Sequence, residues 1–332
     1  MIAMLRRLDP SVIVLTAMIV LLVLIGSSEL PNFLTSKYLL QQLQIASFLG
    51  VVATGAFVVI LLGHIDLSVP WTMTASAMVA TTVAGLGAKL PGAEALSIPL
   101  GILAGMTVGA FNGLGVAVLR VPSMIWTLGV NIVLLGGCVL VTGGFAPKGE
   151  STELMRALAV GRDLGVPNAT LVWLALAAAV ACILSGTAIG RAIYAIGNGE
   201  RAAFLAGVQT GLTLFAAFVF AGGCNAVAGL LLAGYANQAY QAMGDPYLLP
   251  AIAAVVVGGT SIQGGKGAVL NVILAVVFVT LLTSVLSVLQ MNDAQRQVIY
   301  GAVILGTLLI YGRLAPGWAA RRAVTPHSKG SR

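Results

Sequence analysis

An acidic residue lies between two long apolar stretches of this 332-residue chain. Asp66 occurs in Gly63-His64-Ile65-Asp66-Leu67-Ser68-Val69-Pro70, with apolar residues 45–62 before it and 71–88 after it. A carboxylate at membrane depth costs roughly 2.5–3.5 kcal/mol on insertion scales. Such a group persists where it faces protein, a water-filled path or the membrane interface, and it can relay a proton. Asp66 and its neighbour Ser68 are therefore candidate functional residues.

The composition indicates which solvent surrounds these residues. Hydrophobic residues make up 59% of the chain and charged residues only 8%, whereas soluble domains contain about 25% charged residues. A soluble fold of this length could not bury so much apolar side chain, so we expect lipid to be the solvent. The 41 glycines suit close helix packing in a membrane.

Ten apolar stretches are long enough, or nearly so, to cross the hydrocarbon, which takes about 20 residues. Because lipid cannot satisfy backbone polar groups, we predict helices: an all-α, polytopic integral membrane protein forming one transmembrane domain over residues 1–332. The eighth stretch is short and ends in glycines, so its full crossing is left open. The predicted spans are 11–28, 45–62, 71–88, 97–118, 123–143, 170–189, 212–234, 249–263, 269–289 and 296–312.

The charges between these spans indicate an orientation. Segments on the side of the N-terminus contain eleven Lys or Arg and two Asp or Glu, whereas the other side contains six and seven. This bias, which includes a basic tail at 313–332, predicts that both termini are cytoplasmic. The net charge of +7 is thereby explained as a topology signal, and we expect no nucleic-acid partner.

A second stretch resembles the segment around Asp66 because it also interrupts two successive apolar runs. Gly258-Gly259-Thr260-Ser261-Ile262-Gln263-Gly264-Gly265-Lys266-Gly267 interrupts spans eight and nine. Paired interruptions in two halves of a membrane protein indicate a transport path. Plain tight turns are the alternative. A turn needs glycine alone, so the added Asp66, Ser68, Thr260 and Ser261 favour a gate or hinge.

A few polar side chains lie inside predicted spans. Thr127 and Asn131 are four residues apart and share one helical face, and Asn112 lies in the span before them. Amides and hydroxyls of this kind can bind the hydroxyl groups of a sugar-like solute along a translocation path. Hydrogen bonding between helices is the alternative role.

The longest cytoplasmic loop, residues 190–211, contains a short helix-prone stretch. Gly197-Asn198-Gly199 predicts a turn, after which Glu200–Ala206 predicts a helix that Gly207 stops. Another protein's backbone can approach its small-residue face closely. A helix lying on the membrane surface is the alternative, but Arg201 is nearly alone there as a basic residue. The small face consists of Ala202, Ala203 and Ala206.

No catalytic or nucleotide-binding pattern occurs in the sequence. Gly264-Gly265-Lys266-Gly267 lacks the spacing and the hydroxyl of a Walker motif. No cluster of His, Cys and acidic residues has metal-ligand spacing, and the three cysteines are widely separated in apolar stretches. We expect no enzyme activity, no cofactor and no metal in this chain.

Four motifs together resemble the permease subunits of sugar-type bacterial ABC transporters, the ribose, xylose, arabinose and galactose group. They follow that family's order along the chain. The sequence departs from the family at His64, Pro70 and Asn271, where the family has glycine. The motifs are the segment around Asp66, Gly109-Ala110-Phe111-Asn112-Gly113 with Val121-Pro122-Ser123-Met124-Ile125-Trp126-Thr127-Leu128-Gly129, Tyr194-Ala195-Ile196-Gly197-Asn198 with Ala202, Ala203, Gly207 and Val208, and residues 258–267.

The resemblance implies a permease that works as a pair in the bacterial inner membrane, with a second copy or a paralogue. It implies a cytoplasmic ATPase that binds the ATP and a periplasmic solute-binding protein. The ATPase would hold the coupling residues Gly197, Glu200, Arg201, Ala202, Ala203 and Gly207. The helix-break and gate residues would be Gly63, Asp66, Ser68, Gly258, Gly259, Ser261, Gly264 and Gly265.

The expected function is therefore import of a monosaccharide-like solute by alternating access. Three alternatives remain at this point. One is a related ABC permease for branched-chain amino acids or nucleosides, another is an ion-coupled secondary transporter with Asp66 as relay, and the third is a structural membrane scaffold.

Overall fold

The computed structural model describes residues 10–87, 90–145, 147, 149–163 and 165–314 of the chain, and most of them are helical. The helices are α2 (Pro10–Glu29), α3 (Ser36–Leu61), α4 (Val69–Gly85), α5 (Ala93–Gly113), α6 (Ser123–Thr142), α7 (Glu153–Val160), α8 (Asn168–Gly186), α9 (Ala188–Asn198), α10 (Glu200–Leu205), α11 (Thr210–Ala236), α12 (Leu248–Val257), α13 (Val269–Val288) and α14 (Asp293–Leu314).

Three kinds of short element complete the fold. A π-helical turn, η1 (Leu114–Val118), extends α5, and a 3-10 turn, η2 (Asp245–Tyr247), precedes α12. Strands β1 (Arg162–Asp163) and β2 (Val166–Pro167) form a small antiparallel hairpin next to α7, between the fifth and sixth predicted spans. The all-α prediction thus holds for the body of the protein, with this hairpin as the exception.

Each predicted span coincides with a helix, but the boundaries differ. Among the described residues, seven helices are long and apolar enough to cross a membrane: α2, α3, α5 with η1, α6, α8, α11 and α13. Helix α4 has 17 residues, and α12 has 10 and rises about 15 Å, half of a hydrocarbon core of about 30 Å. Ten complete crossings remain a prediction.

Two span boundaries were predicted wrongly. Helix α3 begins at Ser36 rather than at residue 45, because its first turns carry polar residues that hydropathy excludes. Helix α12 ends at Val257 rather than at residue 263, because Gly259 takes a left-handed conformation (φ +80°) that a helix does not accommodate.

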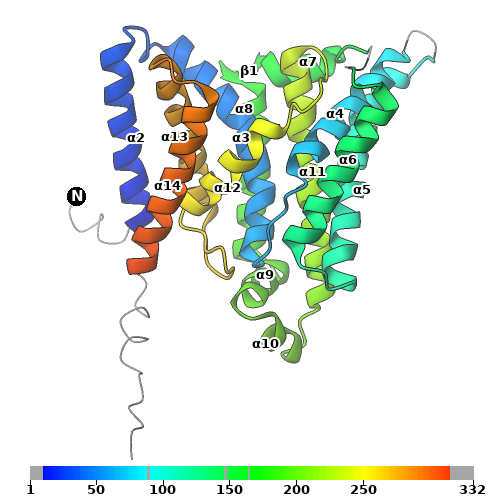
Figure 1. Cartoon of the computed structure of the whole chain (residues 1–332), viewed down its shortest axis with the longest axis vertical. Coiled ribbons are helices and arrows are strands. Elements are labelled where there is room, and N and C mark those ends of the chain that lie inside the picture. Colours follow the sequence, from blue (N-terminus) through cyan, green and yellow to red (C-terminus); the bar gives the residue numbers. More distant parts are fainter. Residues whose placement is uncertain (1–9, 88–89, 146, 148, 164, 315–332) are drawn as a thin grey trace, which may run out of the picture.

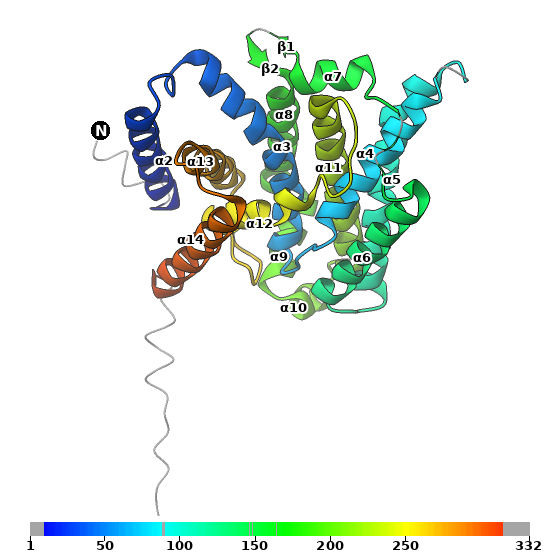
Figure 2. The same ribbon diagram turned by 45° about the horizontal axis from the view of Figure 1, so that its top comes forward.

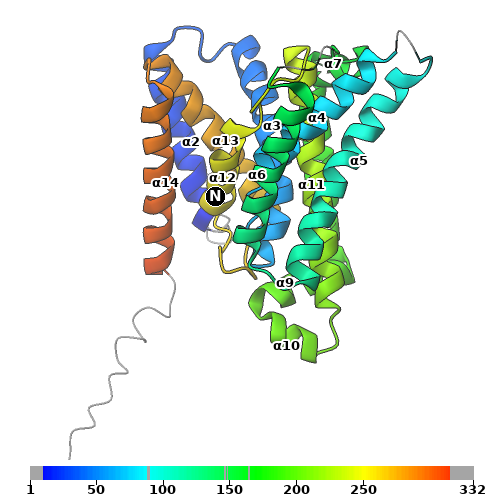
Figure 3. The same cartoon turned by 45° about the vertical axis from the view of Figure 1, so that its right-hand side comes forward.

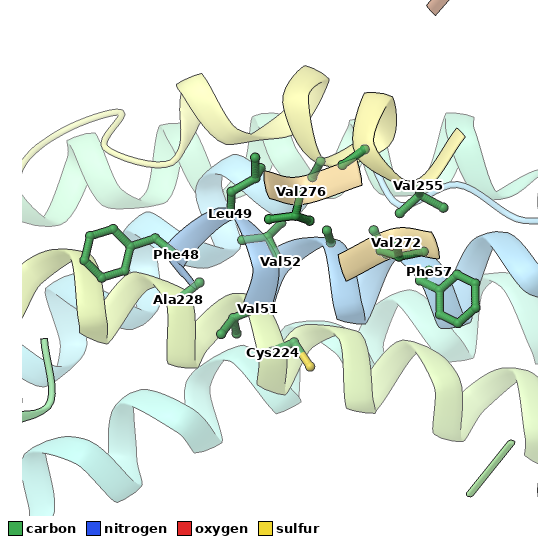
Figure 4. Packing of buried hydrophobic residues seen from close by; sticks show 14 of the residues in the cluster. Phe48, Leu49, Val51, Val52, Phe57, Cys224, Ala228, Val255, Val272 and Val276 are labelled. Atoms are coloured by element: carbon green, nitrogen blue, oxygen red, sulfur yellow. The ribbon is translucent and has the colours of Figure 1, made fainter. Parts of the chain in front are cut away.

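Helix α3 forms the centre of the molecule. Helices α2, α13 and α14 lie on one side of it, and α4, α5 and α6 lie on the other (Figures 1 and 2). Most of α3 is buried, whereas α2 and α6 expose most of their residues. Apolar side chains of α3 pack between those of α11 and α13, as Val51, Val52, Cys224 and Val276 do in Figure 4.

Helices α5 and α11 approach each other through glycine. A Cβ on Gly109 would lie 2.3 Å from the carbonyl oxygen of Phe218, and one on Gly222 would lie 2.2 Å from that of Gly105. Backbone therefore packs directly on backbone here, as small residues allow between membrane helices.

The two ends of the molecule differ in structure. Helices α9 and α10 protrude at one end, where α2 begins and α14 finishes (Figures 1 and 3). Helix α7 and strand β1 lie at the opposite end. The described chain thus starts and finishes on the same side as α10, an arrangement that two termini in one compartment require.

Candidate gate and coupling site

The connection between α3 and α4, residues 62–68, is an extended segment held by side chains of α6. Three backbone N–H groups of this segment and of the start of α4 donate to three polar side chains spaced four apart on one face of α6. The extended backbone has no helix or sheet of its own, so α6 supplies the acceptors it needs. The pairs are Ile65 with Ser123 (3.3 Å), Leu67 with Thr127 (2.9 Å) and Trp71 with Asn131 (3.3 Å).

Asp66 faces protein rather than lipid. It is 6% exposed, and its Oδ1 accepts from the N–H of Ser68 at 2.8 Å and from the Ser68 hydroxyl at 2.7 Å. Asn112, which belongs to α5, donates in turn to that hydroxyl oxygen at 2.7 Å. Among the described residues, Oδ2 of Asp66 and Oδ1 of Asn112 have no hydrogen-bond partner. The acid thus stabilises the start of α4 and ties it to α5.

The hydrogen bonds of Asn112, Thr127 and Asn131 are those expected from interhelical packing. Asn112 and Thr127 are fully buried, and Asn131 is partly buried. A role for these three residues along a translocation path stays a prediction. Sequence reasoning missed Ser123, the first acceptor on α6, although its spacing of four from Thr127 was a usable signal.

The connection between α12 and α13, residues 258–268, is a compact glycine loop. The N–H of Ser261 donates to the carbonyl oxygen of Lys266 and that of Gly264 to Ser261, both at 2.9 Å. Gly264 and Gly265 have φ of +89° and +74°. These left-handed conformations need glycine, which accounts for the glycine pair. The predicted break residues Gly258, Gly259 and Ser261 belong to the same loop.

The two connections and the end of α9 meet in one place, which we call the glycine junction: Leu61, Gly197, Gly264 and Gly265. The N–H of Gly265 donates to the carbonyl oxygen of Leu61 at 2.9 Å. A Cβ on Gly197 would lie 2.0 Å from that oxygen and 2.3 Å from the nitrogen of Gly265. One on Gly264 would lie 2.8 Å from the nitrogen of Gly63. Three segments distant in sequence therefore touch through backbone atoms.

Side chains of α9 reinforce the junction. The Tyr194 hydroxyl donates to the carbonyl oxygen of Gly267 at 2.9 Å, and Asn198 donates to Tyr194 at 2.8 Å and to Gly265 at 3.4 Å. The predicted turn over residues 197–199 is wrong in two of its three positions, because Gly197 and Asn198 belong to α9 and only Gly199 separates α9 from α10. These tertiary contacts outweigh the turn preference of the sequence.

Helix α10 is the outermost element at this end (Figure 3). Arg120, which follows η1, forms an ion pair with Glu200 at its start. Gly207 ends the segment with φ +85°. Of the predicted small face, Ala203 is 4% exposed and faces the protein, whereas Ala202 and Ala206 are exposed. Arg201 beside them is also exposed.

Two exposed apolar side chains on α10 were missed by sequence reasoning. Phe204 is 64% exposed and Leu205 is 78% exposed. The usable signal was the pair of large apolar residues beside a glycine stop, next to the alanines on which the prediction rested. They give the tip of the molecule an exposed apolar surface, which is typical of a protein interaction site.

The seven described helices that are long and apolar enough to cross a membrane define a multi-pass membrane protein. A family model described as "Branched-chain amino acid transport system / permease component" matches residues 38–308. The chain belongs to this family of transport permeases, whose members serve import systems with a separate ATPase and binding protein. No solved structure matches the chain.

Curated relatives of the chain are import permeases for named solutes. The chain is 32% identical to the ribose import permease protein RbsC of Haemophilus influenzae over 298 residues, 88% of this chain and 90% of the relative. It is 34% identical to the autoinducer 2 import system permease protein LsrC of Salmonella typhi over 300 residues, covering 90% and 85%. The RbsC protein of Escherichia coli K12 is 32% identical, covering 89% and 92%. The chain is therefore a permease subunit of the sugar-type ABC importer class.

Proposed function

We propose that this chain imports a monosaccharide-like solute as the membrane subunit of an ABC transporter. A periplasmic binding protein delivers the solute, and a cytoplasmic ATPase that carries the ATP site drives its passage. The printed names of the relatives, ribose and autoinducer 2 import permeases, support this solute class over branched-chain amino acids. The setting is the bacterial inner membrane, with both termini in the cytoplasm and a second copy or a paralogue as permease partner.

The observation that carries the mechanism is the glycine junction. The coupling segment, residues 190–211, contacts the last residue of α3 and the α12–α13 connection through Gly197, with no flexible linker between them. A displacement of α10 by the ATPase would therefore act directly on the α3–α4 and α12–α13 connections. Of the predicted gate residues, Gly63, Gly264 and Gly265 lie at this contact, and the others lie further along the same two connections.

A second route joins α10 to the same gate. Glu200 pairs with Arg120, and Arg120 lies just before α6, whose polar face holds the connection that contains Asp66. Asp66 is fixed by Ser68 and Asn112 within the protein, which supports a structural role at the gate. This placement speaks against Asp66 as an ion relay in a secondary transporter.

The test is reconstitution of the full transporter in proteoliposomes with its ATPase and binding protein. Uptake of labelled D-ribose, D-xylose, L-arabinose and D-galactose is measured with and without ATP. We expect ATP-dependent uptake of at least one sugar and none by the chain alone. Uptake by the chain alone, driven by a proton or sodium gradient, would overturn the proposal.

A further inference from the structure

A cavity of about 900 Å³ lies at the end of the molecule opposite α10. It is bounded by the start of α3, the end of α13, the start of α14 and the segment around η2. Figure 3 shows the α13–α14 turn at that end, far from α9 and α10. The volume falls within the range of roughly 300–1,000 Å³ typical of ligand sites. None of the gate or coupling residues described above lines it.

One wall of the cavity is a stripe of hydroxyl groups on α13. Thr280, Thr283, Ser284 and Ser287 follow the three- and four-residue spacing of one helical face. Thr283 and Ser287 also donate to carbonyl oxygens four residues earlier in the same helix, as hydroxyl side chains in membrane helices commonly do. The stripe gives the cavity a dense set of donors and acceptors that carry no charge.

Tyrosines lock parts of this stripe in place. The hydroxyl of Tyr38, at the start of α3, hydrogen-bonds with the hydroxyl of Ser284, and that of Tyr300, on α14, lies 2.5 Å from the Thr283 hydroxyl. Both rings line the cavity. Their positions are therefore fixed by α13, so they form a preorganised wall rather than mobile side chains.

The Thr280 hydroxyl differs from its neighbours. Thr280 is 5% exposed, and its hydroxyl has no hydrogen-bond partner among the described residues. A buried polar group without a partner carries a desolvation cost of about 1–3 kcal/mol. Because the hydroxyl oxygen has almost no accessible surface, an occupant of the cavity reaches it only if the cavity wall shifts.

The facing wall combines aromatic and polar groups. Tyr240 and Tyr247 line it, together with Asp245 and with Gln42 of α3. Tyrosine offers an apolar ring face to the C–H groups of a ring-shaped solute and a hydroxyl to its polar edge. Carboxylate groups accept hydrogen bonds from sugar hydroxyls, and amide groups both accept and donate them.

We infer that this cavity binds one neutral, polyhydroxylated solute of monosaccharide size within each permease chain, on the side where the binding protein delivers it. The inference rests on the proposed function for the choice of sugar as ligand. It places a solute site among residues of a single chain. A lipid is the competing occupant, and binding and uptake measurements distinguish the two.

The first experiment measures binding to the full chain in nanodiscs. Saturation-transfer NMR with the same four sugars reports contact without the ATPase or the binding protein. We expect transfer to at least one sugar. The variant Ser287→Trp fills the cavity and should reduce the transfer at least tenfold. Ser185→Trp, on the exposed face of α8, is the matched control and should keep it.

The second experiment measures uptake by the reconstituted transporter. Ser287→Trp should lower ATP-dependent uptake at least tenfold while ATPase association stays unchanged. If Ser287→Trp does not fold, Gln297→Trp fills the cavity from its exposed rim and gives the same test.

The outcomes separate this inference from the proposed function. If the unmodified transporter imports sugar but the tryptophan variants import at the same rate, the inference fails and the function stands. Release of a co-purifying lipid by Ser287→Trp without any loss of uptake likewise overturns the inference alone. If no sugar is imported at all, the proposed function fails.

Discussion

The backbone N–H of Gly265 donates a 2.9 Å hydrogen bond to the carbonyl oxygen of Leu61. Leu61 is the last residue of α3, where a helix leaves its carbonyl groups without intrahelical partners. The loop after α12 therefore completes the end of α3. Because both partners are backbone atoms, the contact depends on the close approach that glycine permits.

The junction leaves no room for a side chain at Gly197. Gly197→Ala should lower ATP-dependent uptake at least tenfold and reduce the melting temperature, because its Cβ would overlap the Leu61 carbonyl oxygen and the Gly265 nitrogen. Gly199→Ala is the matched control, since its Cβ would lie 3.8 Å from its nearest neighbour and its φ of 169° is extended. Equal behaviour of the two variants would contradict the junction.

The Thr127 hydroxyl accepts a 2.9 Å hydrogen bond from the backbone N–H of Leu67 in the α3–α4 connection. Among the described residues of this connection, the other N–H group with a side-chain acceptor within 3.0 Å is that of Ser68, which donates to Asp66. Thr127→Val keeps the shape but leaves the Leu67 N–H without an acceptor, so it should destabilise the protein by about 1–3 kcal/mol. Thr127→Ser keeps the hydroxyl and should rescue most of that loss. Thermal unfolding followed by tryptophan fluorescence measures both, and a serine variant as unstable as valine would argue against the bond.

The pair of Arg120 and Glu200 should matter for coupling more than for stability. Its side chains are 56% and 36% exposed, and exposed ion pairs contribute less than about 1 kcal/mol. Arg120→Glu should therefore leave the melting temperature nearly unchanged but lower sugar uptake per ATP hydrolysed. The exchanged pair, Arg120→Glu with Glu200→Arg, should restore the ratio. A ratio unaffected by Arg120→Glu would remove this route from the mechanism.

The apolar tip of α10 should bind the ATPase. Replacing Phe204 and Leu205 by Ser removes apolar surface that is exposed in the free chain, so association with the ATPase should weaken at least tenfold, measured by pull-down from detergent. Leu212→Ser, which alters a leucine that is 63% exposed on α11, is the control and should retain association. Unchanged capture of the ATPase by the double variant would disprove the docking surface.

The positions of the helices could be predicted well from the sequence, and their ends could not. Each of the seven helices that are long and apolar enough to cross a membrane lies at a predicted apolar run. The continuation of α9 through Gly197 and Asn198 depends on contacts with α3 and the glycine loop, which a local pattern does not contain.

The sequence singled out candidate residues for the site, but it did not indicate how they are arranged. Glycines and Asp66 stood out because each is costly or unusual in an apolar setting. That Gly197 would meet Gly265, or that Asn112 would reach Ser68, follows only from tertiary packing. The cavity was missed because its hydroxyl stripe, with Thr280 and Ser284, reads locally as ordinary polar residues in an apolar helix.

Helix α13 begins directly after the glycine loop, at Val269, and ends beside the cavity, at Val288. Its 20 residues rise about 30 Å as one rod. A tilt of about 5° imposed at the loop would sweep the far tip through roughly 2–3 Å, enough to break hydrogen bonds to a seated molecule. One rigid helix would thus carry a displacement of the glycine loop to the wall of the cavity at the opposite end of the molecule.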